Sequence, residues 1–472
     1  MFLPEEGNFM LASRRSFFRT AMSLGVAGSA FPLLSSCSRS QGAPLSETGL
    51  IADPEGLLDL PPGFTYTVHS PAGERMSDGH ITPGSHDGMA CFPVDGDADR
   101  CLLVRNHELD PDEGSAGAFI NGSVTSEVAA KSYDRLRSGE PMPGGTTTLL
   151  FNLRTRRVER SHLSLAGTVG NCSGGLTPWG SWLSCEESRD KAGDICGKDH
   201  GYVFEVPATL RGLADPVPLT AMGRFNHEAT ATDPRTGIIY QTEDEGDSLF
   251  YRFLPDAPGE LAKGGRLQIL SLKGLPGADT SNWNGVQLHV GGSWPVEWLD
   301  IDHVTSPDGD LRLRGHAKGA AMFARGEGMA FAVEPAGNAI YFACTSGGPA
   351  RKGQIWKYVP GAFEGTSDEA SAPGMLTLHY ESPGVGEMDM CDNIVASPWG
   401  DLTVCEDGDD DSFVRGVTPE GRVYSICRAG NGNDSEFAGA CWAPDGETLF
   451  VNLQGPHMTF SIRGPWATIA RV

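Results

Sequence analysis

A hairpin-like repeat is the feature that most restricts how this chain can fold. Each copy has a polar or acidic residue, a short apolar run, a turn of Pro-x-Gly type, a second apolar run and another polar or acidic residue. The clearest copy opens at residues 224–228, turns at residues 233–237 and ends at Glu243. Looser copies turn at residues 93–96, 178–180, 335–337, 398–400 and 444–446. Apolar runs of strand length around a turn with Pro and Gly predict a β-hairpin for every copy.

The six copies together predict an all-β fold, a six-bladed β-propeller. In a propeller each blade adds outer strands to an inner hairpin, and the segments between the copies can supply those strands. The 62 glycines and 32 prolines among 472 residues suit a chain with many short strands and tight turns. We expect residues 41–472 to form one propeller domain. A β-sandwich, or two separate β-domains, is the alternative.

The arm lengths of the hairpins predict where their end residues meet. Glu228 stands six residues before Pro234, and Glu243 stands six residues after Gly237. Equal arms place the two ends of a hairpin opposite each other. In a ring of blades, all such ends lie at one mouth of the channel. The same spacing relates Asp392 to Glu406 and Cys172 to Glu186 across their turns.

Two further acids are expected at the same mouth of the channel. Glu327 and Glu436 each stand eight residues before the turn proline of their copy. That arm is longer by an even number of residues, so we expect the side chain to face the same way. The chain therefore predicts a group of metal-ligating side chains at one rim. The candidate ligands are Glu108, Cys172, Cys185, Glu186, Glu228, Glu243, Glu327, Asp392, Glu406 and Glu436.

Many carboxylates in one place repel each other, and either protons or bound cations relieve the repulsion. Hard cations such as calcium prefer carboxylate and carbonyl oxygen. A thiolate among the carboxylates indicates a softer or redox-active metal beside the hard ones. Cys172 and Cys185, near opposite ends of one hairpin, are the candidate thiolates, and the sequence leaves open which of them binds.

Arg325, two residues before Glu327, is the candidate anion-binding residue at the rim. A fixed guanidinium can hold an oxyanion through two parallel hydrogen bonds. An ion pair with the neighbouring acids explains the same position equally well. His107 and His227 each precede a glutamate after an asparagine, and they are either functional or packing residues.

The formal net charge of −25 argues against nucleic acid as a partner, because phosphate backbones select basic surfaces. Bound cations can still reverse the field locally, so an acidic protein can act on phosphate. Solubility alone also explains the charge.

The N-terminal 40 residues read as an export signal and not as part of the fold. Arg14 and Arg15 precede Phe17 and an apolar stretch at residues 21–34, which resembles a twin-arginine signal. Cys37 follows as a candidate lipidation site, and cleavage in the Ser-rich stretch is the alternative. We expect passage through the twin-arginine translocase and a periplasmic or cell-envelope location. The membrane would be contacted only through a lipid on Cys37.

Ten cysteines remain besides Cys37, an even number, and the compartment expected after export is oxidising. Disulfide bonds are therefore one interpretation. Buried free thiols are the other, because several of these cysteines lie in apolar strand-like runs. These are Cys185, Cys344, Cys405 and Cys441.

Residues 171–187, NCSGGLTPWGSWLSCEE, resemble the signature of PhoX-type alkaline phosphatases. Residues 223–228 with 242–247, and residues 392–394 with 405–408, resemble the same family. The resemblance covers roughly residues 50–460. It implies a six-bladed propeller with an iron–calcium cluster at one end of the channel, and hydrolysis of phosphate monoesters outside the cytoplasm.

The same resemblance implies roles for single residues. One cysteine of the 171–187 motif would ligate iron, and Glu228 and Glu327 would be metal carboxylates. Arg325 would hold phosphate, helped by Asn106. The chain departs from the family in being shorter, and in having Arg-Gly-Glu at residues 325–327 where Arg-Pro-Glu is expected.

Two other functions compete with a phosphatase. The first is a calcium-dependent, lactonase-like hydrolase, since a propeller rim with Glu, Asn and Asp can hold a single metal without a thiolate. The second is a metal-stabilised propeller that binds a partner on its rim without catalysis.

Overall fold

Antiparallel strands make up most of the regular structure in the computed structural model. It describes residues 49–119, 124–335, 337–408, 411–430 and 435–469, all of which lie in one compact unit, residues 42–472. The export signal and Cys37 lie outside the described residues. None of the described helices is long and apolar enough to cross a membrane.

The strands form five antiparallel sheets. The first contains β3 (His86–Val94), β4 (Asp97–His107), β5 (Gly144–Asn152) and β6 (Arg157–Thr168). The second contains β7 (Asn171–Leu176), β8 (Ser181–Glu186) and β9 (Val203–Pro207). Another joins β19 (Cys391–Ala396), β20 (Leu402–Glu406), β21 (Phe413–Val417), β22 (Val423–Ala429) and β1 (Leu58–Asp59). A further sheet joins β23 (Phe437–Trp442), β24 (Leu449–Leu453), β25 (Met458–Arg463) and β2 (Thr65–His69).

The fifth sheet has nine strands and contains two of the repeat hairpins. Its first half is β10 (His227–Thr232), β11 (Ile239–Glu243), β12 (Phe250–Pro255), β13 (Gly265–Leu272) and β14 (Ser293–Asp300). Its second half is β15 (Gly326–Glu334), β16 (Gly337–Cys344), β17 (Gln354–Val359) and β18 (Met375–Glu381). The halves join where β14 pairs with β18.

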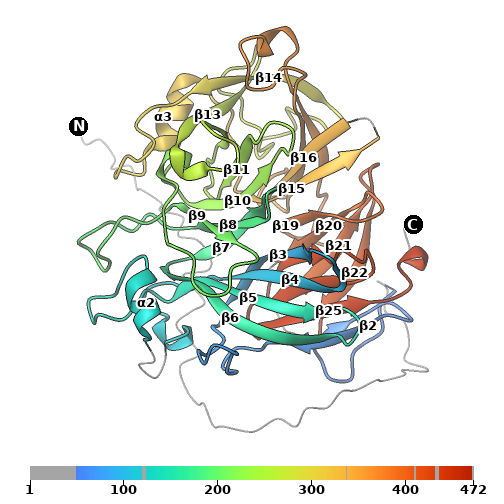
Figure 1. Cartoon of the computed structure of the whole chain (residues 1–472). Coiled ribbons are helices and arrows are strands. Elements are labelled where there is room, and N and C mark those ends of the chain that lie inside the picture. The colour runs from blue at the N-terminus through green and yellow to red at the C-terminus, as the bar shows by residue number, and fades with distance from the viewer. Residues whose placement is uncertain (1–48, 120–123, 336, 409–410, 431–434, 470–472) are drawn as a thin grey trace, which may run out of the picture. The chain divides into compact units, whose positions relative to one another are not determined.

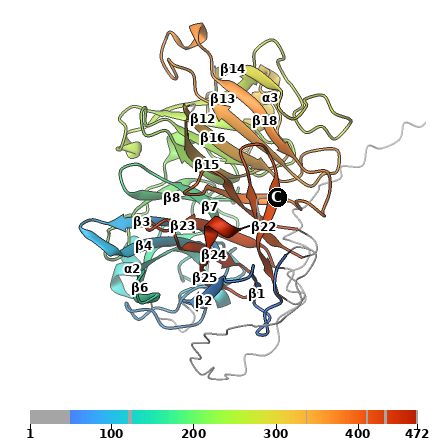
Figure 2. The same ribbon diagram turned by 90° about the vertical axis from the view of Figure 1, so that its right-hand side faces the viewer.

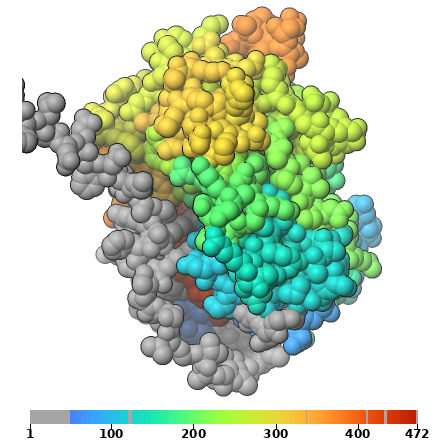
Figure 3. Space-filling view, turned by 90° about the vertical axis from the view of Figure 1, so that its left-hand side faces the viewer, coloured from blue at the N-terminus to red at the C-terminus, as the bar shows by residue number. Residues whose placement is uncertain are grey.

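Helices are short and lie in the connections. The α-helices are α2 (Ser126–Lys131) and α3 (Leu311–Lys318). In Figure 3 the cyan segment carries α2 and the yellow segment carries α3. Single 3-10 turns occur at η1 (Gly114–Ala116), η2 (Thr220–Met222), η3 (Leu261–Lys263), η4 (Glu369–Ser371) and η5 (Trp466–Thr468).

The hairpins expected from the repeat are all present. The two strands of each copy pair antiparallel, as β3–β4, β7–β8, β10–β11, β15–β16, β19–β20 and β23–β24. The first strands of consecutive hairpins contact each other, and β23 contacts β3 to close the circle. The prediction of an all-β propeller is therefore confirmed, with five separate sheets in place of six.

The N-terminal strands complete sheets that the C-terminal strands begin. Strand β2 pairs with β25, and β1 pairs with β22 (Figures 1 and 2). Because these pairs join the two ends of the described chain, they hold the circle closed without a disulfide. The ten cysteines from Cys91 to Cys441 are free thiols, and nine of them are buried, which confirms the interpretation as buried thiols.

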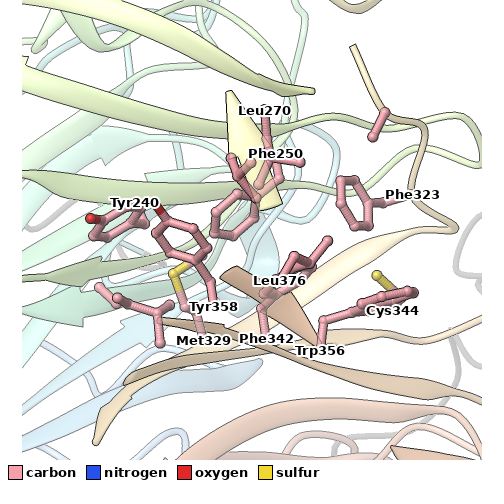
Figure 4. Packing of buried hydrophobic residues seen from close by; sticks show 14 of the residues in the cluster. Tyr240, Phe250, Leu270, Phe323, Met329, Phe342, Cys344, Trp356, Tyr358 and Leu376 are labelled. Carbon is pink, nitrogen blue, oxygen red and sulfur yellow. The ribbon is translucent and has the colours of Figure 1, made fainter. Parts of the chain in front are cut away.

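The largest apolar cluster lies between the two halves of the nine-stranded sheet (Figure 4). Phe250 on β12 stacks on Phe342 on β16, with ring centroids 4.3 Å apart. Trp356, Tyr358 and Leu376 are fully buried beside them. Burying one such side chain stabilises the fold by about 1.5–3 kcal/mol. Packing between the two halves of the nine-stranded sheet therefore stabilises this part of the fold.

Candidate metal centre

A β-bulge opens each innermost strand. In β3, β7, β10, β15, β19 and β23, two residues of the strand stand opposite one residue of its partner. The bulge residues are 87–88, 172–173, 228–229, 327–328, 392–393 and 439–440. The first member of each pair is Asp87, Cys172, Glu228, Glu327, Asp392 or Gly439. The repeat thus places five residues with metal-ligating side chains at equivalent positions around the circle.

Glycine at the bulge lets neighbouring innermost strands approach closely. A Cβ atom on Gly88 would lie 2.6 Å from the Cα of Ser173. A Cβ atom on Gly328 would lie 2.5 Å from the Cα of Asn393. Both distances are too short for a side chain, so these positions require glycine. At Gly328, the close approach accompanies the grouping of Glu327 with Asp392 on the next innermost strand.

The bulge residues and three other acids form three groups of possible metal ligands. In each group, one ligand atom from every residue lies within 4.8 Å of the others. The groups are Cys172–Glu187–Glu228, Glu228–Glu327–Asp392 and Asp87–Glu108–Glu436. Glu228 belongs to two groups and joins them. We call these eight residues the rim cluster.

Two contacts connect the third group. The amide of Gln454 donates to Asp87 Oδ2 at 2.8 Å and to Glu108 Oε2 at 2.5 Å. Glu436 is not at a bulge position but lies just before β23, where Gly439 with φ +62° takes the bulge position. The expectation that Glu436 faces the rim agrees with its place in this group.

Cys172, and not Cys185, lies among the carboxylates. The Cys172 thiol donates to the backbone carbonyl of His227 at 3.2 Å and is buried. Burial, reinforced by the Glu228 carboxylate, raises the pKa of the Cys172 thiol well above its ordinary value. Cys185 packs in an apolar cluster with Leu183 and is in none of the ligand groups found among the described residues.

Arg325 forms the ion pair that its sequence position also allowed. Its Nε and one Nη donate to the two carboxylate oxygens of Asp244, each at 2.7 Å. The same Nη donates to Glu327 Oε1 at 2.8 Å. The backbone of Arg325 has φ +58°, a region that non-glycine residues rarely occupy. Its side chain is 22% exposed, so the guanidinium stands at the edge of the rim cluster and reaches solvent.

Asn106 supports the bulge of the next hairpin. Its Nδ2 donates to the carbonyl oxygens of Cys172 at 3.2 Å and Ser173 at 2.7 Å. Its Oδ1 accepts from Trp182 and Ser184, each at 2.9 Å. These contacts use both ends of the amide, so Asn106 holds the backbone of Cys172 and Ser173 in place.

Three candidate carboxylates, like the Cys185 thiol, are not brought into the rim cluster. Glu186, Glu243 and Glu406 end the second strands and pair with Asn171, His227 and Cys391, one residue before the bulge. Because a shift of one residue turns a side chain to the other face, the equal-arm argument fails at the bulge.

The carboxylates of these three residues hold the loops of their own sheets instead. Glu243 accepts from the amide of Leu249 at 3.2 Å and the hydroxyl of Tyr251 at 2.8 Å. Glu406 accepts from Arg415 Nε at 2.8 Å. Burial raises the pKa of Glu243 and of Glu406 to about 7. A role in holding these loops explains the regular spacing of the three glutamates as well as a role in metal binding does.

The two histidines of the Asn-His-Glu segments are packing residues. His107 bonds to the carbonyl of Gly84 at 2.8 Å and to Thr147 at 2.9 Å. His227 stacks on Phe225 with ring centroids 3.6 Å apart. Burial lowers the pKa of His227 to about 3, so the ring is neutral at physiological pH.

Sequence reasoning missed three residues of this region. Asp87 stands six residues before Pro93, the arm length that identified Glu228, and that spacing could have found it. Glu187 is inside the motif at 171–187, directly after Glu186, the residue that the spacing predicts as a ligand. Asp244 follows Glu243 and has no repeat position of its own, so no sequence signal marks it as the partner of Arg325.

The donor atoms of the rim cluster suit both hard and softer metal ions. Seven carboxylates offer the oxygen ligands that calcium prefers. The thiol of Cys172 adds the sulfur ligand that favours iron or zinc. A cavity of about 340 Å³ has among its lining residues Ser173, Gly328 and Asn393, each of which directly follows a rim-cluster residue in the chain. The residues present therefore fit a metal cluster beside an open space.

Comparisons with known proteins found a matching family and similar folds. The family described as alkaline phosphatase PhoX matches residues 46–457. A solved structure of Pseudomonas fluorescens PhoX, in complex with the transition-state analogue vanadate, has a TM-score of 0.62 and 17% identity. That match covers 89% of this chain and 98% of the other.

A gluconolactonase from Xanthomonas campestris has a TM-score of 0.39 and 13% identity, covering 86% of this chain and 98% of the other. No curated protein sequence matched the chain.

Proposed function

Since the chain belongs to the PhoX alkaline phosphatase family and is a metal-dependent phosphatase, we propose that it hydrolyses phosphate monoesters at the rim cluster. The observation that supports this site most strongly is the convergence of Cys172, Glu228, Glu327 and Asp392 from consecutive bulges. Membership of the family supports the reaction. The bulges gather buried ligands at one place, where bound metals could interact with a charged ester.

We propose iron and calcium as the metals. Cys172, Glu187 and Glu228 would hold iron, because this group contains the thiol. Glu327, Asp392, Asp87, Glu108 and Glu436 would hold calcium through carboxylate oxygens. When bound, the metals would polarise phosphoryl oxygens and lower the pKa of a bound water.

Arg325 would bind and orient the phosphate. Its guanidinium is anchored by Asp244 on one side and directed at Glu327 on the other. A guanidinium fixed before the substrate arrives costs little reorganisation and offsets the charge that grows on the phosphoryl oxygens in the transition state. We assign Asn106 a positioning role, since it holds the backbone of Cys172.

We count the nine-stranded sheet as two blades joined at β14 and β18, which gives six blades in residues 41–472. Each half begins with its own bulged innermost strand, as every other sheet does.

We propose that residues 1–40 direct export through the twin-arginine translocase to the periplasm or cell envelope, with a lipid on Cys37 as the membrane anchor. The acidic chain, at net charge −25, would have no nucleic acid partner.

A substrate assay tests the proposed function. Purified protein is given p-nitrophenyl phosphate or a sugar lactone, before and after a chelator removes its metals. We expect ester hydrolysis that the chelator abolishes and that iron plus calcium restores. Lactone hydrolysis restored by calcium alone, with no turnover of the ester, would contradict the proposal and favour a lactonase.

A further inference from the structure

A second group of ligand types lies outside the rim cluster. It consists of Asp134, between α2 and β5, with Cys196 and His200, between β8 and β9. One oxygen, the sulfur and one ring nitrogen of these residues lie within 4.8 Å of one another, and all three residues are buried. In Figure 3 the green segment that follows β8 lies against the cyan segment that follows α2.

A carboxylate behind His200 fixes the orientation of its ring. His200 Nδ1 bonds to Glu186 Oε1 at 2.7 Å. Glu186 in turn accepts from the backbone amides of Val169 at 3.1 Å and Gly201 at 2.9 Å. On the other side of the ring, Nε2 bonds to Asp134 Oδ2 at 3.2 Å. Histidines that bind metals almost always donate their other ring N–H to such a partner.

Asp134 and Cys196 are also held in place by backbone contacts. Asp134 Oδ2 accepts from the amides of Gly197 at 2.7 Å and Lys198 at 2.8 Å. A Cβ atom on Gly197 would lie 2.8 Å from Asp134 Oδ1, so glycine permits this close approach. The Cys196 thiol donates to the carbonyl of Lys191 at 3.0 Å.

We propose that Asp134, Cys196 and His200 bind a divalent transition-metal ion, and that the ion is zinc. Zinc takes carboxylate oxygen, thiolate sulfur and imidazole nitrogen together, whereas calcium takes oxygen alone. Binding releases the thiol proton of Cys196, and the Nε2 proton of His200 where the ring carries one, to solvent. His200 keeps Nδ1–H, which Glu186 accepts. Zinc has room for a further ligand in its tetrahedral shell.

The ion would tie down the loop at residues 188–199. That loop carries Arg189, which pairs with Glu245 at 2.7 Å. Glu245 follows Asp244, the partner of Arg325. The second site would therefore stabilise a loop next to the rim cluster without supplying a ligand to it.

Zinc content tests the proposal. Purified full-length protein and its Cys196→Ala variant are stripped with a chelator, loaded with zinc, dialysed and measured by elemental analysis. We expect the variant to retain about one zinc ion fewer per chain. Cys91→Ala is the matched control, since Cys91 is a partly exposed free thiol outside every ligand group in the described part of the chain. It should retain as much zinc as the unchanged protein.

Cobalt(II) separates this site from the rim cluster. Cobalt added to the stripped protein should give a thiolate-to-cobalt absorption band. The Cys172→Ala variant should keep the part of the band that comes from Cys196, and the Cys196→Ala variant should lose that part. Alkylation adds a test that needs no variant, because zinc should protect Cys196 from iodoacetamide in the unchanged chain. Equal zinc content and an equal cobalt band in Cys196→Ala, or equal alkylation of Cys196 with and without zinc, would overturn the proposal. Those results would leave Glu186–His200–Asp134 as an ion-pair network only.

Discussion

Arg325 and Asp244 form a two-point ion pair, with both donor–acceptor distances at 2.7 Å. Asp244 is nearly buried and the guanidinium is only partly exposed, so the pair is held in one geometry. The direction of the Arg325 side chain at the rim cluster therefore depends on a residue that ligates no metal in our assignment.

The Asp244→Asn substitution should lower kcat/KM for a phosphate monoester by about tenfold or more, because a misplaced charged group loses much of its effect on the transition state. Metal content should be unchanged. Asp247→Asn is the control, since Asp247 pairs with Arg312 from a half-exposed position and such pairs contribute little. Equal rates for the two variants would show that Asp244 does not orient Arg325 for catalysis.

Cys172→Ser should lose iron, whereas Cys185→Ser should keep it. Both cysteines pack in the same apolar cluster, but among the described residues only Cys172 is also grouped with Glu187 and Glu228. A serine hydroxyl is a much poorer ligand for iron than a thiolate. Iron per chain, measured on the two purified variants, checks the assignment. Loss of iron in Cys185→Ser with iron retained in Cys172→Ser would reverse it.

The buried carboxyl of Glu243 should make stability depend on pH. Burial raises its pKa from 4.5 to about 7, so the folded protein holds the proton over a range where the unfolded chain has released it. The free energy of unfolding should therefore fall as pH rises from about 4.5 to about 7, by up to about 3 kcal/mol.

The Glu243→Gln variant should lack this component, because glutamine resembles the protonated acid and can still accept from Tyr251. Denaturant unfolding at several pH values gives the difference between the variant and the unchanged protein. That difference should shift in favour of the variant up to about pH 7. Glu297→Gln, at an exposed position on β14, should show no such trend. If the difference in unfolding free energy between Glu243→Gln and the unchanged protein does not vary with pH, the pKa of this carboxyl is not raised.

The residues at the turns allowed the hairpins to be predicted from the sequence. The Pro and Gly residues between apolar runs locate each hairpin, and the regular copies indicate a propeller. The joining of two halves into one nine-stranded sheet depends on pairing between β14 and β18, which lie far apart in the chain. No local pattern reports such a pairing.

The rim cluster could be predicted from the sequence only in part. The six-residue arm before the turn marks Cys172, Glu228 and Asp392, which the structure brings close to other ligands. The equivalent arm after the turn marked Glu186 and Glu406 as well, and the structure does not bring them there. The bulge adds one residue to one strand, and at two bulges its second residue, Gly88 or Gly328, packs closely against the next hairpin. That contact is between hairpins, so the spacing within one hairpin does not reveal it.

Metal content of Glu228→Gln tests the central claim most directly, because Glu228 joins the thiol group to the carboxylate group of the rim cluster. Iron and calcium per chain are measured by elemental analysis on the folded variant and on the unchanged protein. We predict that the variant loses iron and part of its calcium, together with phosphatase activity. Unchanged amounts of both metals in Glu228→Gln would contradict the proposal that the bulges hold the catalytic metals.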